Sequence, residues 1–171
     1  MNRQAVQTLK TYFGYDTFRE GQESVVESIL EHRDVLAIMP TGAGKSICYQ
    51  VPALIMPGIT IVISPLISLM QDQVKALNEA GIHAAFINSS LSESQISKAL
   101  YLAAGGRYKI IYVAPERLEN YEFLEFARQV EISMVTVDEA HCISQWGQDF
   151  SKERHSLYFK SGRSESSDYR V

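Results

Sequence analysis

A glycine-rich turn between an apolar run and a helical run is the feature that most constrains this chain. Residues 39–46 read Met-Pro-Thr-Gly-Ala-Gly-Lys-Ser and follow the short apolar run 34–39, which predicts a buried strand. Gly42 and Gly44 let the backbone turn and approach an anion without an intervening side chain. The amides of such a turn, with the positive end of the following helix, bind phosphate. The sequence therefore predicts a P-loop.

The side chains of this loop suit a nucleotide. Lys45 supplies a positive charge to the β and γ phosphates, and Ser46 offers its hydroxyl to a magnesium ion. The general pattern GxxxxGK[ST] has glycine where this chain has Met39, so the match is incomplete. We expect ATP and Mg²⁺ as the ligands. The loop residues expected to hold them are Thr41, Gly42, Ala43, Gly44, Lys45 and Ser46.

Strand-like and helix-like runs alternate along the chain, which indicates βαβ units. The predicted strands are nearly unbroken apolar runs, as expected for a parallel sheet covered by helices on both faces. The fold class is therefore α/β, and 171 residues suit a single domain. The predicted strands span 34–39, 60–64, 82–87, 109–113 and 132–137, and the predicted helices span 2–13, 20–31, 45–56, 66–80, 93–104 and 118–129.

The sequence changes character after residue 150. We expect one domain over residues 1–150 and a divergent, disordered tail over 151–171, where serine and charged residues replace the apolar periodicity. An alternative is that the change marks a frameshift.

Composition excludes some classes of protein. No apolar run approaches the roughly 20 residues of a membrane span, and the first residues lack a secretory signal, so a cytoplasmic location is expected. Cys48 and Cys142 have no metal-ligand spacing, so zinc is not expected and both are interpreted as buried thiols. The net charge of −4 neither supports nor excludes a nucleic-acid partner.

Two adjacent carboxylates complete the expected chemistry. Asp138 and Glu139 directly follow the predicted strand 132–137. The carboxyl end of a parallel strand is the usual ligand position in an open α/β sheet. Asp138 is expected to coordinate Mg²⁺, and Glu139 is the candidate general base that polarises the water attacking the γ-phosphate.

Five motifs, in order along the chain, resemble those of RecQ helicases. Residues 138–141, Asp-Glu-Ala-His, are similar to motif II of superfamily 2 helicases, and 142–150 resembles the RecQ aromatic-rich loop. Residues 13–22 resemble motif 0, residues 64–74 resemble motif Ia, and 114–118 resembles the family's TPER segment with alanine in place of threonine.

The resemblance implies a RecA-like fold and assigns roles to particular residues. Gln22 is expected to read the adenine edge between Tyr15 and Arg19, whose planar groups stack. The resemblance also places His141 in the catalytic motif. The residues that it assigns to DNA contact or coupling are Ser64, Arg117, Trp146 and Phe150.

The family implies a 3′–5′ DNA helicase that acts on single-stranded or forked DNA in recombination and repair. Its motors use a second RecA-like domain with an arginine finger, which this sequence lacks, so unwinding by the chain alone is not expected. The chain also departs from the family pattern at Gln148, where histidine is usual, and at Ser151, where arginine is usual. A truncated nucleotide- or DNA-binding module and a non-functional relic remain alternatives.

Overall fold

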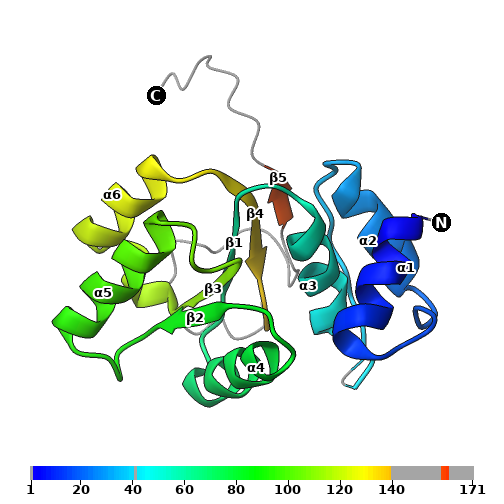
Figure 1. The fold of residues 1–171 in the computed structure, drawn as a ribbon, viewed down its shortest axis with the longest axis horizontal. Helices are drawn as coiled ribbons and strands as arrows, with labels where there is room; N and C mark the ends of the chain where they lie inside the picture. Colours follow the sequence, from blue (N-terminus) through cyan, green and yellow to red (C-terminus); the bar gives the residue numbers. More distant parts are fainter. Residues whose placement is uncertain (1, 41, 140–158, 162–171) are drawn as a thin grey trace.

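The architecture is a twisted sheet between two layers of helices (Figure 1). A computed structural model describes residues 2–40 and 42–139, together with the backbone of residues 159–161. The strand order is β2-β3-β1-β4-β5. Strands β1 to β4 are mutually parallel, whereas β5 is antiparallel to β4. The predicted α/β class with a parallel sheet is thus confirmed for the first four strands.

The residues of the four parallel strands are buried or half-buried. These strands are β1 (Ile59–Ile63), β2 (Ala84–Ile87), β3 (Ile110–Val113) and β4 (Ile132–Val137). All four residues of β3 are buried, since this strand lies between β2 and β1 and has helices on both faces. Continuous apolar strands are the pattern that a doubly covered parallel sheet requires.

Two helices cover one face of the sheet. These are α5 (Glu93–Ala104) and α6 (Tyr121–Gln129), which pack against β1, β2 and β3 through a cluster that includes Ile96, Phe123 and Ile111. Helix α5 begins with a capping box between Ser92 and Gln95, in which each side chain accepts a hydrogen bond from the other's backbone. A short 3₁₀ turn, Pro115–Arg117, precedes α6.

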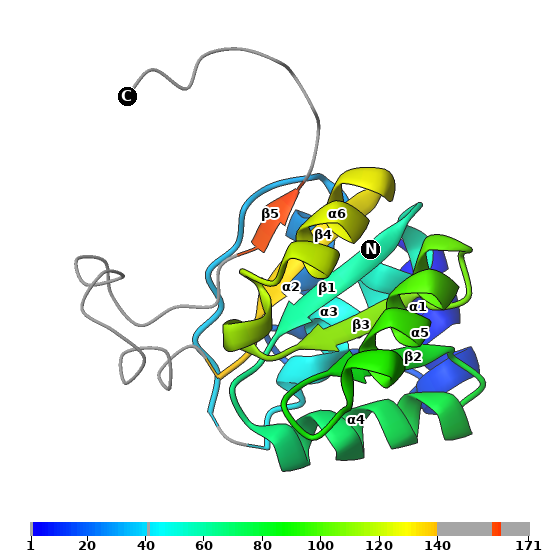
Figure 2. The ribbon, with the colours of Figure 1, turned by 90° about the vertical axis from the view of Figure 1, so that its left-hand side faces the viewer.

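The opposite face carries α3 (Lys45–Ile55) and α4 (Ile67–Glu79). Two elements from the start of the chain lie outside α3 (Figure 1). They are α2 (Gln22–Leu30) and α1 (Arg3–Thr8), which continues as a π-helix over Leu9–Phe13, and both lie at the back in the view of Figure 2. Leu9, Val26 and Val51 form the core between these helices. This outer layer places the segment before α2 beside the start of α3.

The predicted strand over residues 34–39 is wrong. This segment forms no strand, and β4, which is paired with β1 on one side, is paired with β5 on the other. The burial of its side chains still alternates as in a strand, because Val35 and Ala37 pack against the core while Leu36 is 51% exposed and Ile38 is 84% exposed. Apolar periodicity predicts which side chains turn inward, but a strand also needs a neighbouring edge with free hydrogen-bonding groups.

Strand β5 (Phe159–Ser161) falls in the stretch where the sequence predicted no strand. It pairs with β4 in the register Val135 to Lys160. The other residues of the expected tail lie outside the described residues. No helix in the described ranges is long and apolar enough to cross a membrane.

Candidate nucleotide-binding site

The glycine-rich loop has the backbone that a phosphate cradle needs. Gly42 and Gly44 adopt left-handed conformations, with φ of 82° and 75°. Gly44 is the N-cap of α3, and no side chain among the described residues caps this helix. The first amides of α3 therefore lack a side-chain acceptor, and the positive end of the helix dipole favours an anion there. The loop fits a phosphate group.

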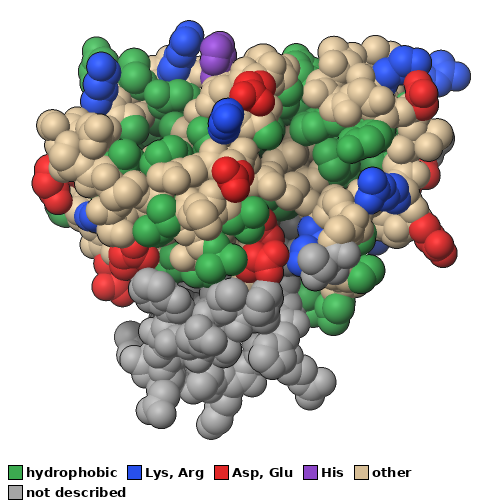
Figure 3. Space-filling model, turned by 90° about the horizontal axis from the view of Figure 1, so that it is seen from below, with side chains coloured by type: hydrophobic (Ala, Val, Ile, Leu, Met, Phe, Trp, Pro, Cys, Tyr) green, Lys and Arg blue, Asp and Glu red, His purple; other side chains and the backbone are tan. Residues whose placement is uncertain are grey.

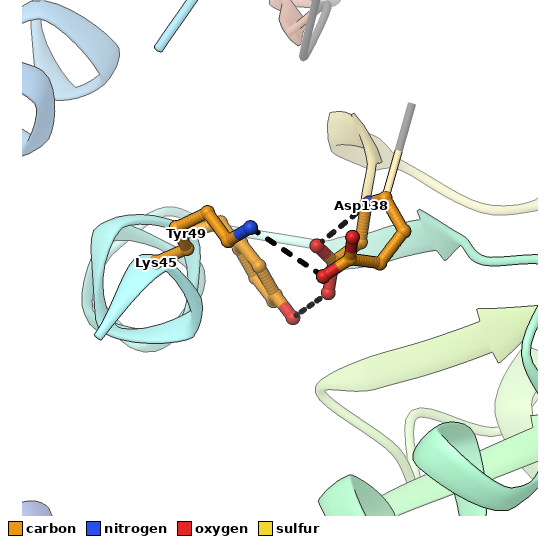
Figure 4. A network of polar contacts seen from close by, with 4 residues as sticks. Lys45, Tyr49 and Asp138 are labelled. Atoms are coloured by element: carbon orange, nitrogen blue, oxygen red, sulfur yellow. Dashed lines mark hydrogen bonds and ion pairs between the residues drawn. The ribbon is translucent and has the colours of Figure 1, made fainter. Parts of the chain in front are cut away.

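The two predicted carboxylates lie opposite the start of α3, and Figure 4 shows Asp138 facing Lys45 and Tyr49. Lys45, the first residue of α3, places its Nζ 3.4 Å from Oε1 of Glu139. Glu139 follows the carboxyl end of β4 and has a left-handed backbone with φ of 52°, which is strained for a residue with a side chain. The structure thus joins the loop lysine and the candidate general base, which are 94 residues apart in sequence.

Asp138 is the most buried of the site carboxylates, with 4% of its surface exposed. One of its oxygens, Oδ1, accepts the backbone N–H of Glu139 at 2.9 Å, and Oδ2 accepts the hydroxyl of Tyr49 at 3.0 Å. Burial raises the pKa of Asp138, and these two hydrogen bonds and the charge of Lys45 act against that rise. Since each bond uses one lone pair, both oxygens keep acceptor capacity.

A magnesium ion fits this site only in company with phosphate oxygens. The described residues contain no group of three or more His, Cys, Asp or Glu side chains that could hold a metal. Mg²⁺ is commonly bound by one or two carboxylates, several waters and substrate phosphates rather than by an all-protein cage. Asp138 and the hydroxyl of Ser46 supply the type of oxygen ligand that such a site uses.

Residues of the predicted motif 0 bind the P-loop directly. Gln22, at the start of α2, is 3% exposed, and its Nε2 donates to the carbonyl oxygens of Ala43 at 2.9 Å and Gly44 at 3.1 Å. Its Oε1 accepts the backbone N–H of Arg19 at 2.9 Å. The Arg19 guanidinium in turn donates to the carbonyl of Gly42 at 2.8 Å. Motif 0 and the loop therefore form one hydrogen-bonded unit.

The space between motif 0 and the loop is small. A cavity of about 50 Å³ is lined by Tyr15, Thr17, Arg19, Gln22, Gly44 and Ile47. This volume suits about one or two waters rather than a purine ring. Tyr15 is half exposed at its margin. The predicted adenine-reading residues are thus brought together, but the amide of Gln22 already has its partners on the loop.

The predicted DNA-contact residues are placed in different environments. Ser64, which follows β1, is 1% exposed, and its hydroxyl has no hydrogen-bond partner among the described residues. Arg117 closes the 3₁₀ turn before α6, and its Nε is likewise buried without a partner there. On the face seen from below, described basic and acidic side chains are interspersed, without a continuous basic stripe (Figure 3).

Several predicted site residues cannot be placed in this geometry. Thr41, His141, Trp146 and Phe150 lie outside the described residues. The roles expected for the aromatic-rich loop and for the histidine of motif II therefore stay predictions.

A chain of buried polar side chains behind Asp138 was missed from the sequence. Tyr49 is fully buried, and its hydroxyl lies 3.0 Å from Asp138 and 3.2 Å from the hydroxyl of Tyr112. Burial raises the pKa of Tyr112 to about 12 and that of Tyr49 well above its usual value, so both are neutral phenols. In the sequence, the one signal of this hydrogen-bonding role is that Tyr49 and Tyr112 carry hydroxyls within otherwise apolar runs.

A larger open cavity lies away from the loop. It measures about 590 Å³ and is lined by residues near the amino ends of the strands, including Ile59, Ile82 and Lys109. None of the predicted site residues that the structure describes lines it. The chemistry of the loop and carboxylates therefore lies elsewhere on the molecule.

A family model described as "DEAD/DEAH box helicase" matches residues 19–163, a range that includes Gln22, the P-loop and the Asp138–Glu139 pair. The chain belongs to the DEAD/DEAH box helicase family. Among curated proteins, it is 54% identical over 151 residues to the ATP-dependent DNA helicase RecQ of Bacillus subtilis, covering 88% of this chain and 26% of that protein. It is 47% identical over 153 residues to RecQ of Haemophilus influenzae, covering 90% and 25%.

These matches confirm the resemblance to RecQ helicases, and the chain spans about a quarter of the length of these relatives. A solved helicase structure has the same fold. The DUF1998 helicase MrfA bound to DNA aligns with a TM-score of 0.60 at 19% identity, covering 75% of this chain and 19% of that one. This chain is therefore similar to RecQ proteins in sequence and to a more distant helicase in fold.

Proposed function

We propose that this chain is the ATP-binding part of a RecQ-type DNA helicase, the first RecA-like domain of a motor that couples ATP hydrolysis to 3′–5′ DNA unwinding in recombination and repair. The observation that carries the proposal is the convergence of Lys45 on the carboxylates at the end of β4, with Nζ 3.4 Å from Glu139. A lysine on a phosphate loop facing a paired carboxylate is the arrangement that nucleotide hydrolysis uses. RecQ relatives are named ATP-dependent DNA helicases.

In the proposed site, backbone amides at the start of α3 hold the phosphates and Lys45 neutralises their charge. Asp138 and Ser46 would hold Mg²⁺, which supplies charge stabilisation to the phosphate oxygens when bound. Glu139 would then exchange its contact with Lys45 for the attacking water. Lys45 and the amides thus bind phosphate, Asp138 and Ser46 would bind the metal ion, and Glu139 would orient the water and accept its proton.

Adenine recognition by Gln22 requires a change of partners. Its amide donates to two loop carbonyls and accepts one backbone amide. We propose that nucleotide binding opens the small cavity beside Tyr15 and frees part of this amide for the base. The hydrogen bonds between motif 0 and the loop would then change when nucleotide binds, and this change would be transmitted to the rest of the domain.

Binding of a fluorescent ADP tests the proposal. Lys45→Ala should weaken the affinity by at least about 10-fold, because a charge-assisted contact to phosphate contributes more than 1.4 kcal/mol. Lys75→Ala is the matched control, since Lys75 is an exposed lysine on α4 that forms an ion pair with Glu79. Equal affinities of Lys45→Ala and the wild type would refute the proposed nucleotide site.

Residues 1–171 by themselves are proposed not to unwind DNA. Translocation needs two bodies that close and open around the nucleotide, and the charge-stabilising arginine of such motors comes from the second body. A strand-displacement assay on forked DNA with Mg²⁺ and ATP should therefore give no single-stranded product. ATP-dependent displacement by the 171-residue chain would contradict this part of the proposal.

A further inference from the structure

A buried chain of hydrogen bonds connects Asp138 to the middle of α4. Tyr49 lies at 3.0 Å from Oδ2 of Asp138 and at 3.2 Å from the hydroxyl of Tyr112. Gln50, the next residue on α3, donates from Nε2 to the Tyr112 hydroxyl at 3.1 Å and to Oε1 of Gln73 at 2.9 Å. Tyr49, Tyr112 and Gln50 are each at least 96% buried.

The donors and acceptors of this chain have a defined direction when Asp138 is ionised. A carboxylate only accepts, so Tyr49 donates its single proton to Asp138. Tyr112 must then donate to the oxygen of Tyr49, and its own oxygen accepts from Gln50. The two protons of the Gln50 amide are used by Tyr112 and Gln73. From Gln50 through Tyr112 and Tyr49, the protons therefore point toward the carboxylate, whereas the second proton of the Gln50 amide points toward Gln73 on α4.

We propose that Tyr49 is a positioning residue for the metal-binding carboxylate, and that Tyr112, Gln50 and Gln73 hold Tyr49 in place. This inference rests on the proposed function of the site. The Tyr49 hydroxyl donates a hydrogen bond to one oxygen of Asp138, and the backbone N–H of Glu139 donates to the other. These two donors fix the plane of the carboxylate.

The positions of these residues explain why a tyrosine is used. Tyr49 lies one helical turn after Lys45, so the same helix carries the loop lysine and the group that orients Asp138. A phenol reaches across the apolar layer between α3 and β4 and ends in one hydrogen-bond donor. Phenylalanine fills the same volume without that donor. The Tyr49→Phe substitution therefore isolates the hydroxyl.

The test compares the affinity of a fluorescent ADP in Mg²⁺ with its affinity in EDTA, for the full 171-residue chain. Loss of a group that orients a metal ligand typically weakens metal binding by about 10- to 100-fold. Tyr49→Phe should therefore reduce the ratio of the two affinities by about 10-fold or more, while the affinity in EDTA stays unchanged. Tyr112→Phe should reduce the ratio in the same direction by a smaller factor.

Tyr108→Phe is the matched control, because Tyr108 lines the remote cavity beside Lys109. An unchanged ratio in Tyr49→Phe would overturn the inference, as would equal losses of affinity in Mg²⁺ and EDTA. Should Tyr49→Phe fail to fold, an unchanged ratio in Tyr112→Phe would overturn it. Failure of the proposed function looks different, because the wild type itself would then bind no nucleotide or bind it as well as Lys45→Ala does.

Discussion

Replacement of Gln22 by alanine is predicted to loosen the P-loop and to destabilise the domain. The side chain is 3% exposed and makes three hydrogen bonds, of 2.9 Å to Ala43, 3.1 Å to Gly44 and 2.9 Å from Arg19. At about 1 kcal/mol each, their loss lowers the free energy of unfolding by about 3 kcal/mol. For a chain of this size, each kcal/mol corresponds to about 2–4 °C, so Tm should fall by about 6–12 °C.

Thermal unfolding followed by circular dichroism measures this change. Gln71→Ala is the control, because Gln71 is exposed on α4, and its substitution should change the free energy of unfolding by no more than about 0.5 kcal/mol. Gln22→Glu should be at least as damaging as Gln22→Ala, since it places a carboxylate oxygen against two carbonyl oxygens. A Gln22→Ala variant with the same Tm as the wild type would refute the claim that motif 0 and the loop form one hydrogen-bonded unit.

Two further predictions concern the carboxylate and the segment before the loop. Burial raises the pKa of Asp138, so the unfolded chain releases this proton at a lower pH than the folded chain does. The free energy of unfolding therefore falls as the pH rises above the usual aspartate range and Asp138 ionises. Asp138→Asn should therefore shift the urea midpoint upward relative to the wild type more at pH 7 than at pH 4; a difference that does not grow with pH would count against the assignment. Val35→Ala should cost about 1–2 kcal/mol in urea unfolding, whereas Ile38→Ala, at an 84% exposed position, should change stability by less than about 0.5 kcal/mol. Equal losses in both variants would instead indicate a segment buried on both faces.

Much of the fold follows from local sequence pattern. The strand at 132–137 and the helix at 93–104 have the predicted bounds, because their apolar period and flanking polar residues are local signals. Segment 34–39 has an equally clear apolar pattern and forms no strand. Its pattern correctly indicates that Val35 turns inward, but pairing depends on which strand occupies the edge of β4, and that is a property of the whole sheet.

The site was predictable to the extent that its motifs are contiguous. Lys45 and Glu139 were assigned to one site from motif order, and the structure brings them to 3.4 Å. The bonds of Gln22 to the loop and of Tyr49 to Asp138 join residues 21 to 89 positions apart, and no local pattern encodes their distance. An amide at a helix start resembles a surface residue, and a tyrosine among apolar residues resembles core. Only packing distinguishes these alternatives.

The position of the nucleotide is the central claim, and backbone amide shifts on addition of Mg·ATP measure it most directly. In a ¹⁵N-labelled sample, the largest shifts should fall on Gly42 to Ser46, on Asp138 and Glu139, and on Arg19 and Gln22. The open cavity around Ile59, Ile82 and Lys109 should show little change and serves as the internal reference. Shifts confined to that cavity, or the same loop shifts in Lys45→Ala, would contradict a nucleotide site built on the P-loop and the end of β4.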